Sequence, residues 1–188
     1  MQDQHNPTVM FNGMLAPVIP YAMRGVLWYQ GESITPPKEL YPLWNETLIK
    51  DWRSLWNREF PFYFCQLAAL DQPSNTPQVR AWQAEALQLP QTAMAVTIDI
   101  GDKKNVHPKD KQDVGLRLTR IALAKTYGRD IESSGPQPEG VTAEAGGVAH
   151  QVLPCQGWPG RQRRPAQDPR SGRSRWAIRR RGCHDRWQ

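Results

Sequence analysis

The stretch of sequence that decides the fold is GVLWYQGES, residues 25–33. Its first five residues form a short apolar run that ends at a polar Gln-Gly pair, a pattern typical of a strand buried inside a sheet. Residues 60–67 and residues 93–98 are apolar runs of the same kind. The sequence therefore predicts a sheet with three buried strands.

Helical periodicity separates the first two of these runs. Residues 38–56 have apolar side chains at spacings of three and four, which predicts an amphipathic helix with one apolar face. That face consists of Leu40, Trp44, Leu48, Trp52 and Leu55. We expect the tryptophans of this helix to lie in the core, namely Trp44, Trp52 and Trp56.

Two more helices are predicted further along the chain. Residues 77–88 begin with a proline, which is favoured in the first turn of a helix, and residues 109–127 repeat apolar side chains at helical spacing. Gly128 follows at a position typical of a C-terminal helix stop. Strands that alternate with helices in this way predict an α/β fold with a parallel sheet.

Charge is distributed unevenly along the chain. The 188 residues include 24 Lys and Arg against 18 Asp and Glu, a net charge of +6. Residues 151–188 contain ten arginines, no lysine and two aspartates, so this tail carries +8 and the first 150 residues carry −2. The basic character therefore belongs to the tail and says nothing about the partners of the body.

The C-terminal part also differs from the body in its pattern. Beyond residue 148 no strand or helix period is visible, and such a segment buries too little apolar area to offset ~1–2 kcal/mol of backbone entropy per residue. We predict one domain over residues 1–136, followed by a linker and an arginine-rich, disordered tail over residues 137–188. The excess of arginine over lysine suggests a different origin for the tail, such as a change of reading frame.

Composition excludes several classes of protein. No apolar run approaches the ~20 residues needed to cross a bilayer, so neither a transmembrane helix nor a membrane partner is expected. The first residues lack a charged segment followed by an apolar stretch, so no secretory signal is predicted in this sequence. Three cysteines without a CxxC pair indicate neither a disulfide framework nor a zinc module, and we expect no metal and no cofactor.

Polar residues follow each predicted strand directly, at residues 30–33, 67–74 and 99–107. Ligands of open parallel α/β sheets bind at the carboxyl ends of the strands, so we expect these three segments to form the site. Gln30 can donate hydrogen bonds through its side-chain amide, and Gly31 allows its backbone to approach a ligand closely.

The same segments contain titratable candidates. Glu32 is an acceptor that can orient a neighbour, and His107 can act as a general base near neutral pH. Its ring partner is left open among Asp99, Asp102 and Asn105. A lone histidine before a proline is more often a surface or capping residue, so the alternative for His107 is structural. Ser33 does not fit a nucleophile elbow, because the second glycine of G-x-S-x-G is missing.

Several blocks of the chain together resemble one known family. The blocks are NGM at residues 12–14, GVLWYQGES at 25–33, DWR at 51–53, QLA at 66–68, Arg80 with Gln83, DIGD at 99–102 and HPK at 107–109. In this order, from residue 6 to residue 136, the chain resembles the sialate O-acetylesterase family of SGNH-type carbohydrate esterases. The resemblance implies part of a flavodoxin-like parallel sheet flanked by helices.

The resemblance also implies a reaction: hydrolysis of O-acetyl groups on sialic acid or a related sugar, without a metal or cofactor. In that family a serine attacks the ester, a histidine acts as base and an acid orients the histidine. The implied base is His107, and the implied acid is Asp102, with Asp99 as the alternative. The implied oxyanion and substrate-binding residues are Gln30, Gly31, Glu32, Arg80 and Gln83.

The chain departs from the family pattern at the nucleophile. The family carries its serine in a Gly-Gln-Ser-Asn block upstream of the WYQGES block, and these 188 residues contain no such block. Lys104 stands three residues before His107, where SGNH enzymes often have the acid, and Ile34 replaces the asparagine that usually follows Gly-Glu-Ser. We therefore expect this chain by itself to be inactive as an esterase.

The tail provides an alternative function of a different class. Its arginines can neutralise phosphates and its tryptophans can stack on bases, so the tail could bind a polyanion or nucleic acid. The tryptophans in question are Trp158, Trp176 and Trp187. We rank nucleic acid below an O-acetylated sugar as the partner, because an altered reading frame explains the same composition. A third option is a sugar-binding remnant without catalysis.

Overall fold

The computed structural model of the chain describes residues 6, 8–33, 38–71, 77–135, 137–144 and 147–153. The chain divides into two compact units, residues 1–119 and residues 120–188. No helix in the described part of the chain is long and apolar enough to cross a membrane.

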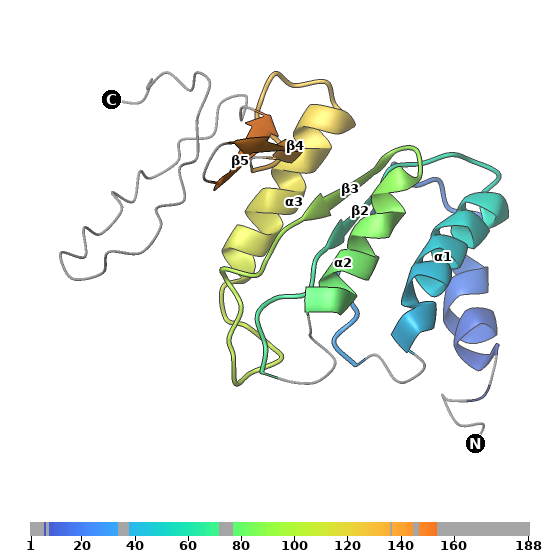
Figure 1. The fold of residues 1–188 in the computed structure, drawn as a ribbon. Helices are drawn as coiled ribbons and strands as arrows, with labels where there is room; N and C mark the ends of the chain where they lie inside the picture. The colour runs from blue at the N-terminus through green and yellow to red at the C-terminus, as the bar shows by residue number, and fades with distance from the viewer. Residues whose placement is uncertain are drawn as a thin grey trace. The chain divides into compact units, whose positions relative to one another are not determined.

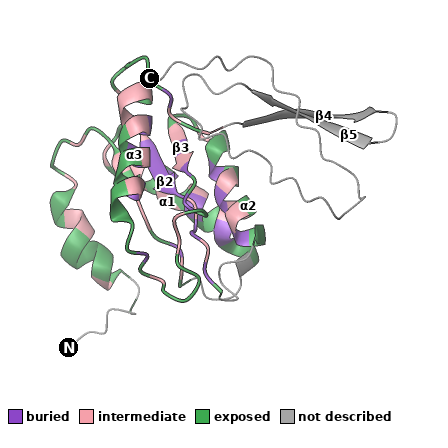
Figure 2. Ribbon diagram, turned by 90° about the vertical axis from the view of Figure 1, so that its left-hand side faces the viewer, coloured by how far each residue is buried: buried purple, intermediate pink, exposed green. Residues whose placement is uncertain are grey.

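The first unit is built on a three-stranded parallel sheet with the order β1-β2-β3 (Figure 1). Its strands are β1 (Val26–Trp28), β2 (Phe62–Cys65) and β3 (Thr92–Ala95). All four residues of the central strand β2 are buried, and Figure 2 shows this strand as a continuous buried segment. The structure thus confirms the predicted α/β fold with a parallel sheet.

The helices also match the periodicity. A 3-10 turn (Lys38–Leu40) leads into α1 (Tyr41–Leu55), and α2 (Pro77–Glu85) begins at the proline expected in its first turn. A further 3-10 turn (Ala86–Gln88) follows α2. Helices α1 and α2 lie against each other on one face of the sheet (Figure 1).

The last helix, α3 (Lys111–Lys125), is followed by Gly128 at a φ of +63°. This left-handed conformation is typical of a glycine that ends a helix, so the predicted stop is confirmed. No helix or strand was predicted before residue 25, where the structure has a π-helix (Phe11–Leu15) and a 3-10 turn (Ala16–Val18).

An aromatic core fills the space between the sheet and α1. Its fully buried members are Ile49, Phe60, Phe62, Phe64 and Ala86. Partly buried tryptophans surround them, and the rings of Trp28 and Trp52 meet edge to face with centroids 5.7 Å apart. Such pairs add to the stabilisation that burial of apolar area alone provides.

The most buried face of α1 is displaced by one residue from the face that the periodicity predicted, although Leu48 and Trp52 of the predicted face still pack against the core. Its buried residues are Tyr41, Asn45, Ile49 and Arg53. Trp44 is 41% exposed, so its prediction as a core residue is wrong, while Trp52 and Trp56 pack half-buried against the core. Two of the four buried residues, Asn45 and Arg53, are polar, so apolar spacing alone does not mark this face.

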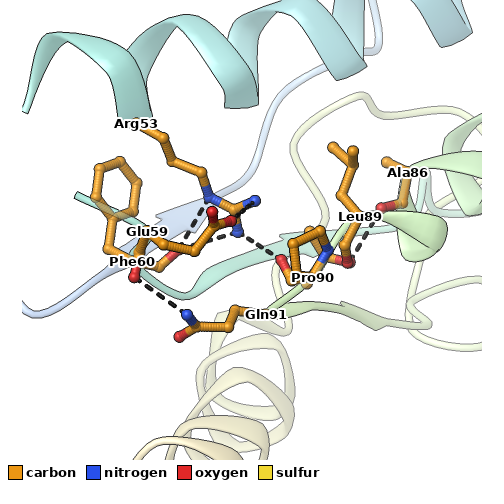
Figure 3. Close-up of polar contacts among 8 residues, drawn as sticks. Arg53, Glu59, Phe60, Ala86, Leu89, Pro90 and Gln91 are labelled. Atoms are coloured by element: carbon orange, nitrogen blue, oxygen red, sulfur yellow. Dashed lines mark hydrogen bonds and ion pairs between the residues drawn. The ribbon is translucent and has the colours of Figure 1, made fainter. Parts of the chain in front are cut away.

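Arg53 is buried because its guanidinium ties the amino-terminal ends of two strands together (Figure 3). Nε and Nη2 donate to the Phe60 carbonyl at 3.2 and 3.0 Å, and Nη2 donates to the Pro90 carbonyl at 2.7 Å. Nη1 lies 2.7 Å from a carboxylate oxygen of Glu59. The two carbonyls precede β2 and β3, so this Arg53 clamp fixes the strands at one end of the sheet.

The second unit contains a hairpin that the sequence analysis did not predict. Strands β4 (Gln137–Glu144) and β5 (Gly147–Leu153) pair antiparallel, where a linker and unstructured chain were expected. Residue 144 pairs with residue 147, and such local pairing costs little loop-closure entropy, so it needs no long apolar pattern. The predicted disorder of residues 154–188 lies outside the described residues, and the division at residue 136 stays a prediction.

Candidate active site at the carboxyl ends of the strands

The segments that follow β1, β2 and β3 meet at the carboxyl end of the sheet. A Cβ added to Gly31 would lie 3.2 Å from the side chain of Leu67, which places the segment after β1 against the segment after β2. A Cβ added to Gly101 would lie 2.5 Å from the Ala69 nitrogen, so only glycine fits the close contact between the segments after β2 and β3. The structure therefore brings the three predicted site segments together.

Gly31 is held in a conformation that favours glycine. Its φ is +143°, and besides Leu67 the hydroxyl of Tyr41 lies 3.2 Å from the position of an added Cβ. An L side chain here would be strained in its backbone and crowded by its neighbours. Gly31 is buried, whereas Gln30 before it is exposed and Glu32 after it is half-buried.

Gln83 of α2 lies beneath this glycine and is only 1% exposed. Its Oε1 accepts a hydrogen bond from the Leu67 amide at 2.8 Å. Its Nε2 donates to the Cys65 carbonyl at 3.3 Å and to the Tyr41 hydroxyl at 3.4 Å. The amide is thus bonded at both ends inside the protein, and Gln83 is not exposed to a ligand.

Two other contacts fix the ends of the strands. Thr97 is fully buried after β3, and its hydroxyl donates to the Gln66 carbonyl after β2. Arg80 is half-buried on α2, and its carbonyl accepts a hydrogen bond from Gln66 Nε2 at 3.4 Å. A hydrogen-bonded layer therefore supports the site from below.

Glu32 acts electrostatically on three groups from three segments. Burial and, to a lesser extent, the carboxylate of Glu32 raise the pKa of the Cys65 thiol to about 12. Burial and Glu32 likewise raise the pKa of Tyr29, and burial raises that of Tyr41 against the hydrogen bond from Gln83. Cys65 therefore stays a neutral thiol near pH 7, and its unreactive form argues against a nucleophilic role.

Lys111, the first residue of α3, lies over the ring of Tyr29. Its Nζ is 4.6 Å from the ring centroid and donates to the Tyr29 hydroxyl at 3.4 Å. The start of α3 is therefore attached to the segment after β1, next to Gln30 and Gly31.

The loop between β3 and α3 is held by Arg117. Both carboxylate oxygens of Asp99 accept from its guanidinium, at 2.6 and 2.7 Å, and Nη1 also donates to the Val96 carbonyl at 2.6 Å. The hydrogen bond from Arg117 holds the pKa of Asp99 below its usual value. Both carboxylate oxygens of Asp99 are therefore engaged with Arg117.

His107 lies on the same loop and is exposed. Its backbone amide donates to the side-chain oxygen of Asn105 at 2.9 Å, and the Lys104 amide donates to the Asp102 carboxylate at 2.9 Å. Among the described residues, no hydrogen bond joins the His107 imidazole to Asp102 or Asp99. The two turns fix the path of the loop, and the imidazole faces solvent.

Sequence reasoning missed Tyr41, Thr97 and Arg117. Tyr41 and Arg117 lie on predicted helices, but their partners are 42 and 18 residues away, and no local pattern marks such pairs. In the described part of the chain, no group of three or more His, Cys, Asp and Glu residues lies close enough to hold a metal ion.

The parallel sheet and the loops at its carboxyl end define an α/β domain with its candidate site at the carboxyl ends of the strands. A family model described as "Carbohydrate esterase, sialic acid-specific acetylesterase" matches residues 8–124, which is more than half of the chain. The chain belongs to this family of carbohydrate esterases.

Relatives and a solved structure agree with this assignment. The human sialate O-acetylesterase is 35% identical over 156 residues, and the mouse protein is 33% identical over the same length. These matches cover 70% of this chain but 30% and 29% of the relatives, so the chain spans about three tenths of their length. The crystal structure of a carbohydrate acetylesterase from Xanthomonas citri matches with a TM-score of 0.72 and 30% identity, over 81% of this chain and 37% of that one.

Proposed function

We propose that this chain forms the base and oxyanion side of an esterase that removes O-acetyl groups from sialic acid or a related sugar. The observation that carries the proposal is the backbone of Gly31, held in a glycine conformation on a buried hydrogen-bonded layer. The loop that carries His107 reaches the same end of the sheet. The names of the relatives supply the substrate class.

In the proposed reaction a serine hydroxyl attacks the acetyl carbonyl while His107 takes its proton. The Gly31 amide and the Gln30 side chain donate to the developing oxyanion, and such donors are worth roughly 3–4 kcal/mol each in other enzymes. His107 then returns the proton to the departing sugar oxygen, and water hydrolyses the acetyl-enzyme. Glu32 and Arg80 are the proposed contacts to the sugar.

We assign the orienting acid to Asp102 rather than Asp99. Arg117 already occupies both oxygens of Asp99, whereas Asp102 has one oxygen bonded to the Lys104 amide and is exposed on the His107 loop. A carboxylate in this role holds the imidazole in the correct tautomer. The geometry would form when the loop tightens around the substrate, as catalytic hydrogen bonds often do.

The serine nucleophile would come from a Gly-Gln-Ser-Asn block, which the 188 residues do not contain. We therefore propose that the chain by itself is inactive. The test is acetate release from 4-nitrophenyl acetate by the chain alone and by the chain co-expressed with a segment that carries that block. Release is expected only in the second sample, and His107→Ala should abolish it there. A burst of release from the chain alone would refute the proposed inactivity.

Polyanion binding by the tail remains the second proposal, supported by the ten arginines of residues 151–188. It predicts that RNA affinity falls steeply between low and moderate salt and disappears when these residues are removed. Weak binding that does not depend on the tail would reject polyanion binding and leave the esterase role as the single proposal.

A further inference from the structure

The proposed esterase mechanism has no use for the buried side chain of Gln83, which contacts the segments after β1 and β2. Gln83 is bonded to the Leu67 amide and the Cys65 carbonyl at the end of β2, and to the Tyr41 hydroxyl at the start of α1. Its Nε2 is also 3.6 Å from the position of a Cβ added to Gly31. One side chain thus joins the sheet, a helix and the glycine.

Tyr41 extends this network from Gln83 toward Gly31. Its hydroxyl accepts from Gln83 at 3.4 Å and lies 3.2 Å from the position of the Gly31 Cβ. The tyrosine is buried, so its hydroxyl cannot exchange this bond for water without moving the ring. The side-chain direction of Gly31 therefore faces two polar groups, and Gln83, which donates to Tyr41, is itself bonded at the end of β2.

We propose that Gln83 and Tyr41 are positioning residues, which set the orientation of the Gly31 peptide and do not touch the substrate. The inference rests on the proposed function, because it assumes that the Gly31 amide faces the ester oxygen. It also replaces the role that family resemblance implied for Gln83, which was direct contact with the substrate. An amide suits this place because it accepts from one backbone N–H and donates to a backbone carbonyl and a tyrosine hydroxyl.

The test uses the 188-residue chain and backbone ¹⁵N order parameters, which report the rigidity of single amides. Tyr41→Phe removes only the hydroxyl and leaves Gln83 bonded to Leu67. We expect the order parameter of Gly31 to fall from about 0.85, typical of rigid backbone, to below about 0.6, while that of Leu67 is unchanged. Gln83→Met removes both links, and both order parameters should fall.

Tyr21→Phe is the matched control, because it removes a hydroxyl from a ring that is 75% exposed, and it should change neither amide. A rigid Gly31 in folded Tyr41→Phe would overturn the proposal. If the variants do not fold, the unmodified chain gives a second measurement: the Gln83 side-chain amide protons should show nuclear Overhauser effects to the Gly31 α-protons, and their absence would overturn it.

These measurements do not depend on hydrolysis. Failure of the complemented enzyme to release acetate would reject the proposed function, and a flexible Gly31 in Tyr41→Phe would still establish the support beneath it. Conversely, an active complemented enzyme with a rigid Gly31 in that variant would reject the positioning role alone.

Discussion

At the amino-terminal ends of β2 and β3 the charged side chain of Arg53 ties two strands together, whereas at the carboxyl end of β2 the neutral amide of Gln83 joins one strand to helices α1 and α2. The Arg53 clamp uses all three guanidinium nitrogens on Phe60, Pro90 and Glu59. Gln83 makes three weaker bonds beneath Gly31. At the amino-terminal end the polar groups bond to one another within the protein, whereas at the carboxyl end the buried bonds of Gln83 lie beneath the exposed residues of the candidate site.

The two ends of the sheet therefore differ in the charge of the buried side chain that holds them. A buried guanidinium beside the site would favour one charge state of its neighbours, as Arg117 does for Asp99. A neutral amide holds the backbone without such a field. Gln30 and His107 are exposed at this end of the sheet.

The largest effect is expected at the amino-terminal end. Arg53→Met leaves the Phe60 and Pro90 carbonyls without their donor, and it should lower the free energy of unfolding by roughly 3 kcal/mol. Urea denaturation measures this loss. Glu59→Gln is the control, because it breaks only an ion pair with a half-exposed acid and should cost at most about 1 kcal/mol. Equal losses in the two variants would show that the carbonyl bonds add nothing.

An intermediate effect is expected at the carboxyl end. Gly31→Ala forces a side chain into a φ of +143° and against Leu67, and it should cost more than about 1 kcal/mol. Gly115→Ala is a matched control of opposite sign. It lies in α3 with nothing within 4 Å of an added Cβ, so it should stabilise the chain by about 0.5–1 kcal/mol. A neutral Gly31→Ala would mean that the glycine is not held tightly.

The smallest effect is expected in the pH dependence of the free energy of unfolding, through Asp99 on the His107 loop. Arg117 lowers the pKa of Asp99 in the folded state, so this carboxylate stabilises the fold above its unfolded pKa of about 3.9 and loses that effect as the pH falls. Because Asp99 is exposed, the contribution should be about 0.5 kcal/mol or less. Between about pH 5 and pH 3, the free energy of unfolding should therefore fall slightly less in Asp99→Asn than in the unmodified chain. An identical slope would remove Asp99 from the groups that hold the loop.

Much of the fold could be predicted, because three strands and three helices have strong local patterns. The predicted burial of β1 was wrong, since this strand lies at the edge of the sheet and Leu27 is exposed. The runs around Val26, Phe62 and Ala93 and the prolines and glycines at helix ends are local signals. The buried face of α1 could not be predicted, since Arg53 is buried through carbonyls that only the folded chain brings near. The β4–β5 hairpin was missed because its strands pair as close neighbours in the sequence and do not need an alternating apolar pattern.

The candidate site divides in the same way. Gln30, Gly31 and His107 could be proposed from the polar residues after each strand and from family resemblance. The engagement of Asp99 by Arg117 could not, because it depends on a side-chain geometry across 18 residues. Nor could the burial of Gln83, since a glutamine in a family motif looks the same whether it faces a ligand or the interior.

Strand β1 also has a consequence for the behaviour of the chain in solution. Within the described residues β1 pairs with β2 alone, and Leu27 in its middle is 58% exposed. Its outer backbone amides and carbonyls are a template for one more strand, and a free edge does not distinguish a strand of its own protein from one of a neighbouring copy. Self-association of this chain should therefore increase with its concentration, and a strand that pairs with β1 should act as its solubiliser.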